Sequence, residues 1–128
     1  MNNIKSIHSN LYFVTDVVKT AEFYKNLGFD VNVLNNTARI AMNDFTLEFI
    51  NEATAEIADE VGSKNKGTGI YTYIKTNDVD KQYKYIVENG LEPSSEPKDW
   101  PWGKREFAIK DPDGYKIIFY SKIIDGKK

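Results

Sequence analysis

The spacing of apolar residues divides the chain into two similar series of secondary-structure elements. In the first series, apolar residues at helical spacing predict a helix over 17–27, with Thr15-Asp16 as its N-terminal cap and Gly28 just past its end. Asn43-Asp44 separates two alternating runs and predicts a hairpin turn. The strands expected in this series are 7–14, 29–34, 37–42 and 45–50.

The same series begins again after a polar segment, in which 53–61 is expected to contain a short helical turn. Asn77-Asp78 caps a helix predicted over 79–88, and Asn89-Gly90 ends it. Asp111-Pro112-Asp113-Gly114 predicts a tight turn, because proline presets φ and glycine accepts a positive φ. The strands expected in this series are 69–76, 105–109 and 115–120.

The two series align with each other as an internal repeat. Thr15-Asp16-Val17 matches Asn77-Asp78-Val79 at an offset of 62 positions, and 45–49 matches 115–119 at an offset of 70. The repeat predicts an α+β fold of two tandem βαβββ units in a single domain over 1–128. One face of each sheet is then covered by a helix, and the other needs a second unit, a partner subunit or a ligand. We expect unit 1 at about 5–51, a linker at about 52–68 and unit 2 at about 69–122.

Composition narrows the classes of function. The chain has no cysteine, which excludes disulfides, thiolate metal sites and a cysteine nucleophile. A net charge of −2 and a pI near 5.4 argue against a nucleic-acid partner and favour a neutral or cationic ligand. The polar N-terminus has no signal-peptide pattern, and no apolar run reaches membrane-spanning length, so we expect a cytoplasmic location with no membrane partner.

Several motifs occur in a characteristic order, namely Asp16 with Glu22-Phe23-Tyr24, Leu27-Gly28-Phe29, Glu106-Phe107-Ala108 and Asp111-Pro112-Asp113-Gly114. In this order and spacing they resemble the glyoxalase / bleomycin resistance / dioxygenase superfamily, the vicinal-oxygen-chelate (VOC) fold. The resemblance runs from about 7 to 120 and implies a curved mixed sheet with the helices on its outer face.

The stretch around Pro101-Trp102-Gly103 is most similar to the bleomycin-binding resistance proteins of that superfamily, although Lys104 is one extra residue in the run. By this resemblance, Trp102 lines a drug groove at the interface of a homodimer. An alternative interpretation is that this tryptophan only plugs the end of the sheet.

In metal-dependent members of the superfamily, the ligands lie on the first and fourth strands of each unit. The repeat places those positions at Ser9, Glu48, Tyr71 and Ile118. Only Glu48 is a plausible ligand, whereas a divalent metal needs about three good protein ligands. The single histidine, His8, is one residue out of register and needs a β-bulge to point the same way. We therefore predict no metal, no cofactor and no catalytic residue.

Strand alternation assigns aromatic and charged side chains to the uncovered face of the sheets. A pocket of this kind suits a flat, partly cationic ligand held by stacking and a carboxylate, although the same aromatics can fill an interface between units or subunits. Arg39 is expected opposite Glu48 across the hairpin, so an ion pair is a sufficient structural reason for Glu48. The predicted ligand-binding residues are Trp102, Tyr71, Tyr73, Phe13, Glu48, Arg39 and Glu106.

The sequence therefore favours a non-catalytic, metal-independent homodimer that sequesters a drug-like molecule, such as a bleomycin-type glycopeptide antibiotic, and so confers antibiotic resistance. One alternative is an enzyme, either a glyoxalase-like lyase or isomerase or a dioxygenase, in which Glu48 acts with a metal completed by His8 or by a partner subunit. Another alternative is a structural or regulatory dimer that binds no ligand.

Overall fold

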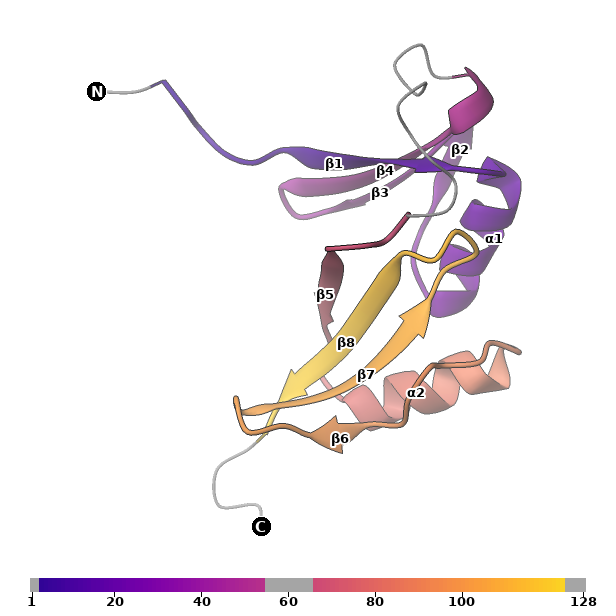
Figure 1. Cartoon of the computed structure of the whole chain (residues 1–128). Coiled ribbons are helices and arrows are strands. Elements are labelled where there is room, and N and C mark those ends of the chain that lie inside the picture. The colour runs from indigo at the N-terminus through magenta and orange to yellow at the C-terminus, as the bar shows by residue number, and fades with distance from the viewer. Residues whose placement is uncertain (1–2, 55–65, 124–128) are drawn as a thin grey trace.

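The computed structural model describes residues 3–54 and 66–123 and confirms two tandem βαβββ units (Figure 1). The first unit contains β1 (Ser9–Val14), α1 (Val17–Leu27), β2 (Asn32–Leu34), β3 (Thr37–Met42) and β4 (Phe45–Asn51), followed by the short helix η1 (Glu52–Thr54). The second contains β5 (Tyr71–Lys75), α2 (Val79–Glu88), β6 (Lys98–Asp99), β7 (Lys104–Lys110) and β8 (Lys116–Lys122).

The two sheets have the same topology. Their strand orders are β1-β4-β3-β2 and β5-β8-β7-β6. In each sheet the first strand of the unit pairs in parallel with the last, and the other pairings are antiparallel. Figure 1 shows both helices on the right-hand side of the molecule, beside their sheets. The internal repeat in the sequence is therefore a repeat of structure.

Local capping fixes both helices at the predicted bounds. The Asp16 carboxylate accepts hydrogen bonds from the backbone N–H groups of Val18 and Lys19, and Asp78 caps α2 in the same way. Gly28 ends α1 in the left-handed conformation with φ 115°. Across residues 3–54 and 66–123, neither helix has the length and apolar content that a bilayer crossing requires.

Strand ends agree less closely with the prediction. β1 begins at Ser9 rather than at 7, and β5 covers 71–75 rather than 69–76. β2 begins only at Asn32, the first residue with a partner on β3, because Phe29 and Val31 pack against the core instead. The helical turn expected over 53–61 begins as η1, and positions 55–65 lie outside the described residues.

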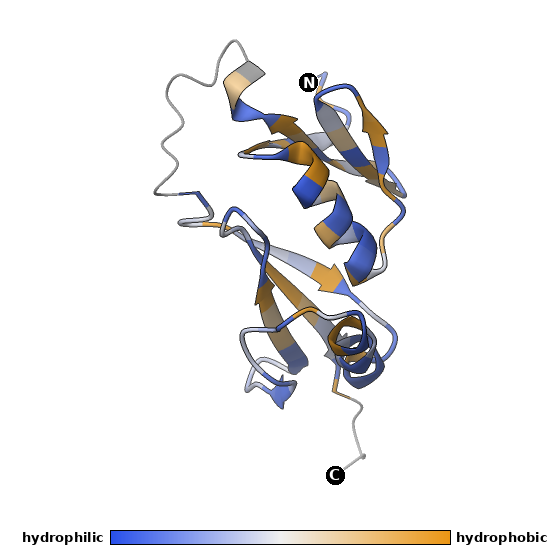
Figure 2. Cartoon of the chain, turned by 90° about the vertical axis from the view of Figure 1, so that its right-hand side faces the viewer, coloured by the Kyte–Doolittle hydropathy of each residue, from blue (hydrophilic) through white to orange (hydrophobic). Residues whose placement is uncertain are grey.

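One hydrophobic core joins the helix-facing sides of both units. Rings of the first unit, Tyr12 and Phe49, stack with centroids 5.3 Å apart, as do Phe107 and Phe119 of the second. Phe29 lies 6.4 Å from Phe119 and connects the two groups. Figure 2 views the molecule from the helix side, where hydrophobic and hydrophilic stretches alternate along α1. The helix-facing strand positions are apolar and buried, namely Ile40, Phe49, Phe107, Ile109, Ile117 and Phe119.

A buried hydrogen bond ties α1 to the turn between β7 and β8. The Tyr24 hydroxyl donates to Asp111 Oδ2 at 2.9 Å, while Asp111 Oδ1 accepts from the backbone N–H groups of Asp113 and Tyr115. Burial raises the pKa of the Asp111 carboxyl, and these donors only partly oppose it. Burial, together with the Asp111 charge, also raises the pKa of Tyr24 well above its ordinary value. The hydroxyl therefore stays a donor at neutral pH.

A second polar link between the units surrounds Asp113. Its Oδ1 accepts from the backbone N–H and the hydroxyl of Thr15, at 3.0 and 2.6 Å, and from Lys66 Nζ at 3.1 Å. The Lys66 side chain is only 2% exposed and also pairs with Glu52 at 2.6 Å. Burial alone lowers the pKa of Lys66, but its bonds to Glu52 and Asp113 outweigh that effect and raise it.

Candidate functional site

A cavity of about 390 Å³ lies on the second sheet, on the side away from the core. The two-residue period of β5 points Tyr71 and Tyr73 to the same face, while Thr72 and Ile74 of the other parity are less exposed. β7 supplies Glu106 to this cavity by the same rule. The side chains that matter for the argument below are Tyr71, Tyr73, Trp100, Trp102, Glu106 and Lys116.

The turn between β6 and β7 carries both tryptophans. The Gly103 N–H donates to the Trp100 carbonyl at 3.1 Å, with Pro101 at the second position and Gly103 at φ 88°. This turn stacks the two indoles, with ring centroids 4.9 Å apart and planes 9° from parallel. The Lys98 ammonium lies 4.5 Å from the Trp100 ring. Trp102 is nevertheless 58% exposed, so it is available to stack on a ligand.

Glu106 is the negative charge of the cavity. It is 7% exposed, and its Oε2 accepts a hydrogen bond from Trp102 Nε1 at 2.8 Å. Burial and then the Glu106 charge raise the pKa of Tyr73, which lines the same cavity. Within 3–54 and 66–123, Glu106 forms no ion pair with a basic side chain. A buried carboxylate that accepts from a neutral indole N–H favours a positive charge brought by a ligand.

Lysines of the chain lie over several of the tyrosine rings. Lys116 Nζ is 5.0 Å from the centroid of Tyr71. Lys104 Nζ is 5.2 Å from the centroid of Tyr73 and 4.7 Å from that of Tyr120. Each distance is within the range of a cation–π interaction, so these rings already bind ammonium groups within the protein.

The structure separates the predicted ligand-binding residues into two places. Tyr71, Tyr73, Trp102 and Glu106 come together in the cavity. The remaining three are in the first unit: Phe13 on β1, Arg39 on β3 and Glu48 on β4.

The cross-strand pairing expected of Arg39 and Glu48 is confirmed. They are register partners on β3 and β4, and Arg39 Nη2 lies 3.6 Å from Glu48 Oε1. The Glu48 carboxylate therefore has a partner within the protein.

Sequence reasoning missed the roles of Trp100 and Lys104. Trp100 supports Trp102 through the stack and also lines the cavity. The available signal was the Trp-Pro-Trp-Gly sequence, which places both indoles in one predicted turn. Nothing in the sequence predicted that Lys104 lies over the rings of Tyr73 and Tyr120, apart from its being one extra residue in that stretch.

The positions at which related proteins hold a metal do not fit one in this chain. Ile118 offers no donor atom and is 5% exposed, and Glu48 faces Arg39. His8 is exposed and precedes β1. In the described part of the chain, no three His, Cys, Asp or Glu side chains are grouped so that they could hold a metal ion. The donor chemistry thus gives no basis for a metal-dependent step.

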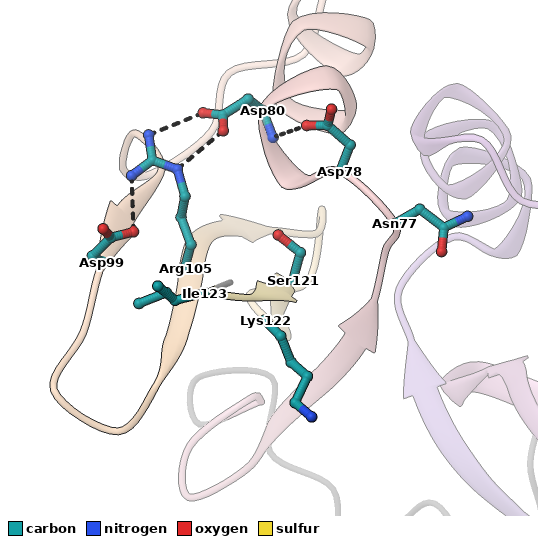
Figure 3. Close-up of a pocket in the computed structure, with 8 residues that line it drawn as sticks. All are labelled: Asn77, Asp78, Asp80, Asp99, Arg105, Ser121, Lys122 and Ile123. Atoms are coloured by element: carbon teal, nitrogen blue, oxygen red, sulfur yellow. Dashed lines mark hydrogen bonds and ion pairs between the residues drawn. The ribbon is translucent and has the colours of Figure 1, made fainter. Parts of the chain in front are cut away.

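A second cavity, of about 500 Å³, lies beside the N-terminus of α2 (Figure 3). Arg105 donates to both oxygens of Asp80 at 3.0 Å and to Asp99 at 3.1 Å. The Asp78 carboxylate caps α2. Most of the charged groups here are already paired or used in capping, so the first cavity is the better candidate.

Comparison with known proteins agrees with this fold. Residues 6–119 match the family model of the Glyoxalase/Bleomycin resistance protein/Dioxygenase superfamily. The chain is 31% identical over 119 residues to the uncharacterized protein YraH of Bacillus subtilis (strain 168), covering 86% of this chain and 93% of that protein.

Solved structures of low sequence identity share the architecture. A glyoxalase/bleomycin resistance protein/dioxygenase from Nocardioides matches with a TM-score of 0.78 and 18% identity, covering 99% of this chain and 89% of its own. A lactoylglutathione lyase from Agrobacterium tumefaciens matches with a TM-score of 0.70 and 14% identity, covering 94% and 96%. At these identities the likeness shows the fold alone.

Proposed function

This chain belongs to the Glyoxalase/Bleomycin resistance protein/Dioxygenase superfamily, and we propose that it is a metal-independent member that binds and sequesters a small organic molecule without transforming it. The observation that carries the proposal is the cavity in which stacked indoles and two tyrosines surround the buried Glu106 carboxylate. The ligand is a planar aromatic compound, neutral or cationic, and a bleomycin-type glycopeptide antibiotic is the first candidate.

Two interactions account for binding. The face of Trp102 that does not contact Trp100 can stack on an aromatic ring, and such pairs contribute about 0.5–1.5 kcal/mol beyond the burial of area. A protonated amine near Glu106 forms a hydrogen bond to a charged acceptor, worth about 1.5–3 kcal/mol. Together they select an aromatic ring that carries a basic group.

Catalysis has less support. A lyase or dioxygenase mechanism that uses Glu48 requires that carboxylate to be free to hold a metal or to remove a proton, whereas it pairs with Arg39 at 3.6 Å. The matching position in the second unit is Ile118, which cannot take either role. The side chains at these positions therefore support binding better than turnover.

We further propose that the protein is a cytoplasmic homodimer. On the sides of the two sheets away from the core, Leu11, Tyr71, Tyr73 and Trp102 are between 45% and 58% exposed, and a second copy can cover such apolar surface. Light scattering on the purified protein tests the dimer, and a monomer at all concentrations would contradict it.

Isothermal titration calorimetry with metal-free bleomycin tests the binding function. We expect saturable binding that Glu106→Gln weakens roughly tenfold or more, because the charge–charge part of the contact is lost. Glu48→Gln is the matched control and should bind as the wild type does. Failure to bind bleomycin would remove that drug as the ligand, and an unchanged affinity in Glu106→Gln would remove the site.

Metal analysis of the purified protein tests the proposed metal independence. One equivalent of nickel, zinc, manganese or iron per chain, lost in a Glu48→Ala variant, would contradict metal independence.

A further inference from the structure

Lys104 occupies a two-walled aromatic cage at one end of the cavity. Its ammonium lies 4.7 Å from the ring centroid of Tyr120 and 5.2 Å from that of Tyr73. The two rings are 6.0 Å apart and inclined at 64°, so they form adjacent walls. Aromatic walls of this kind recognise organic ammonium groups through the negative potential of the ring faces.

The cage and the cavity are adjacent and share Tyr73. Its ring is one wall of the cage, and the same residue lines the cavity together with Glu106. Lys104 and Glu106 lie two positions apart on β7 and hence on the same face of the sheet. A ligand that reaches Glu106 therefore meets the cage at the same time.

In the described part of the chain, the contacts of the Lys104 ammonium are with the two tyrosine rings. Within 3–54 and 66–123, Lys104 forms no ion pair with a carboxylate. Its side chain is half-buried at the start of β7, immediately after Gly103, so it can swing out of the cage without breaking a salt bridge.

We propose that the Tyr73–Tyr120 cage is an ammonium subsite of the ligand cavity and that Lys104 occupies it as an internal competitor. The inference rests on the proposed binding function and adds the chemical class: an aromatic ring bearing a methylated or protonated nitrogen. A cationic ligand must displace the Lys104 ammonium, whereas a neutral aromatic ligand need not. Lys104 thereby sets how strongly the cavity prefers cations over neutral rings.

The test compares N-methylquinolinium with quinoline, which has the same ring system and is neutral at neutral pH. Calorimetry measures both affinities in the wild type, in Lys104→Met and in Lys122→Met. Lys122 is the control, because it is the register partner of Lys104 on β8 and its loss changes the net charge equally outside the cage. Methionine keeps an unbranched apolar side chain of similar length and removes the ammonium group.

We expect Lys104→Met to raise the affinity for N-methylquinolinium relative to quinoline roughly three- to tenfold, since a cation–π contact becomes available to the ligand. Lys122→Met should leave this ratio within about twofold of the wild type, because an exposed charge is screened. Adding Tyr120→Leu to Lys104→Met should abolish the gain by removing one wall of the cage.

A second measurement does not depend on any variant. In the wild-type protein, the nuclear magnetic resonance signals of the Lys104 side-chain methylenes should be shifted upfield by the ring currents. Those shifts should disappear as N-methylquinolinium saturates the site.

The outcomes separate the inference from the proposed function. An unchanged ratio in Lys104→Met, or unshifted methylene signals in a protein that binds the probes, overturns the inference alone. Binding of neither probe by any of these proteins overturns the ammonium subsite together with the binding function that it rests on.

Discussion

The hydrogen bond between Tyr24 and Asp111 gives the sharpest prediction about stability. The two residues are 3% and 5% exposed and lie 2.9 Å apart, on α1 and on the β7–β8 turn. Tyr24→Phe keeps the ring and its packing against Phe49 and removes only the hydroxyl. Asp111 Oδ1 keeps its two backbone donors, but Oδ2 loses its partner.

A hydrogen bond to a charged group contributes about 1.5–3 kcal/mol, so we expect Tyr24→Phe to lower the free energy of unfolding by that amount at neutral pH. Burial already raises the pKa of Asp111, and loss of the hydroxyl raises it further. A raised carboxyl pKa destabilises the fold fully above the folded-state pKa, and this destabilisation is lost as the pH falls from the folded-state pKa to the unfolded-state pKa. The difference between variant and wild type should therefore shrink in acid.

Urea denaturation followed by far-ultraviolet circular dichroism measures this difference. Tyr85→Phe is the control, because Tyr85 is 45% exposed and its change should stay within about 0.5 kcal/mol. Asp111→Asn should be milder than Asp111→Ala, since the amide keeps an oxygen for the backbone donors and can donate to the Tyr24 oxygen. If Tyr24→Phe were as mild as the control, the hydrogen bond would not hold α1 to the turn.

Three other changes test the fold by the same denaturation assay. Asp113→Ala should lower the free energy of unfolding by about 2–4 kcal/mol, because Lys66 is left buried with one partner fewer. The raised pKa of Lys66 stabilises the fold below its unfolded-state pKa, and this contribution is lost as the pH rises through the folded-state pKa. A variant whose stability at alkaline pH followed the wild-type profile would contradict the pairing. Gly67→Ala should destabilise the fold much more than Gly69→Ala. Both glycines have φ near +84°, but of the two only Gly67 would bring a Cβ against backbone, 2.2 Å from the Gly114 carbonyl oxygen. Equal losses of stability in the two variants would refute this packing. Arg105→Met should cost less than about 1 kcal/mol despite its three hydrogen bonds, because its partners are exposed, and a larger loss would show that the network is structural.

Features set by neighbours in sequence were predictable. The start of each helix followed from its aspartate cap. The pairing of Arg39 with Glu48 followed from the length of the turn between β3 and β4. Such signals act over a few residues, where propensity and turn chemistry decide the outcome.

Features that depend on distant segments were not predictable. The buried contact between Tyr24 and Asp111 joins positions far apart in the chain, and no local pattern marks it. β6 was missed because Lys98–Asp99 is only a pair of exposed polar residues, whose strand character comes from pairing with β7. The position of Lys104 over Tyr73 and Tyr120 depends on the register of three strands at once.

The stacked pair formed by Trp100 and Trp102 has an optical consequence. The chain contains two tryptophans in all, and both belong to this pair. The electronic transitions of two indoles this close couple by an exciton mechanism. The coupling gives a band with a positive and a negative lobe in circular dichroism, and the band vanishes when either ring is replaced. The circular dichroism of the indoles therefore reports on the turn between β6 and β7 alone, and it changes if a bound molecule separates the two rings.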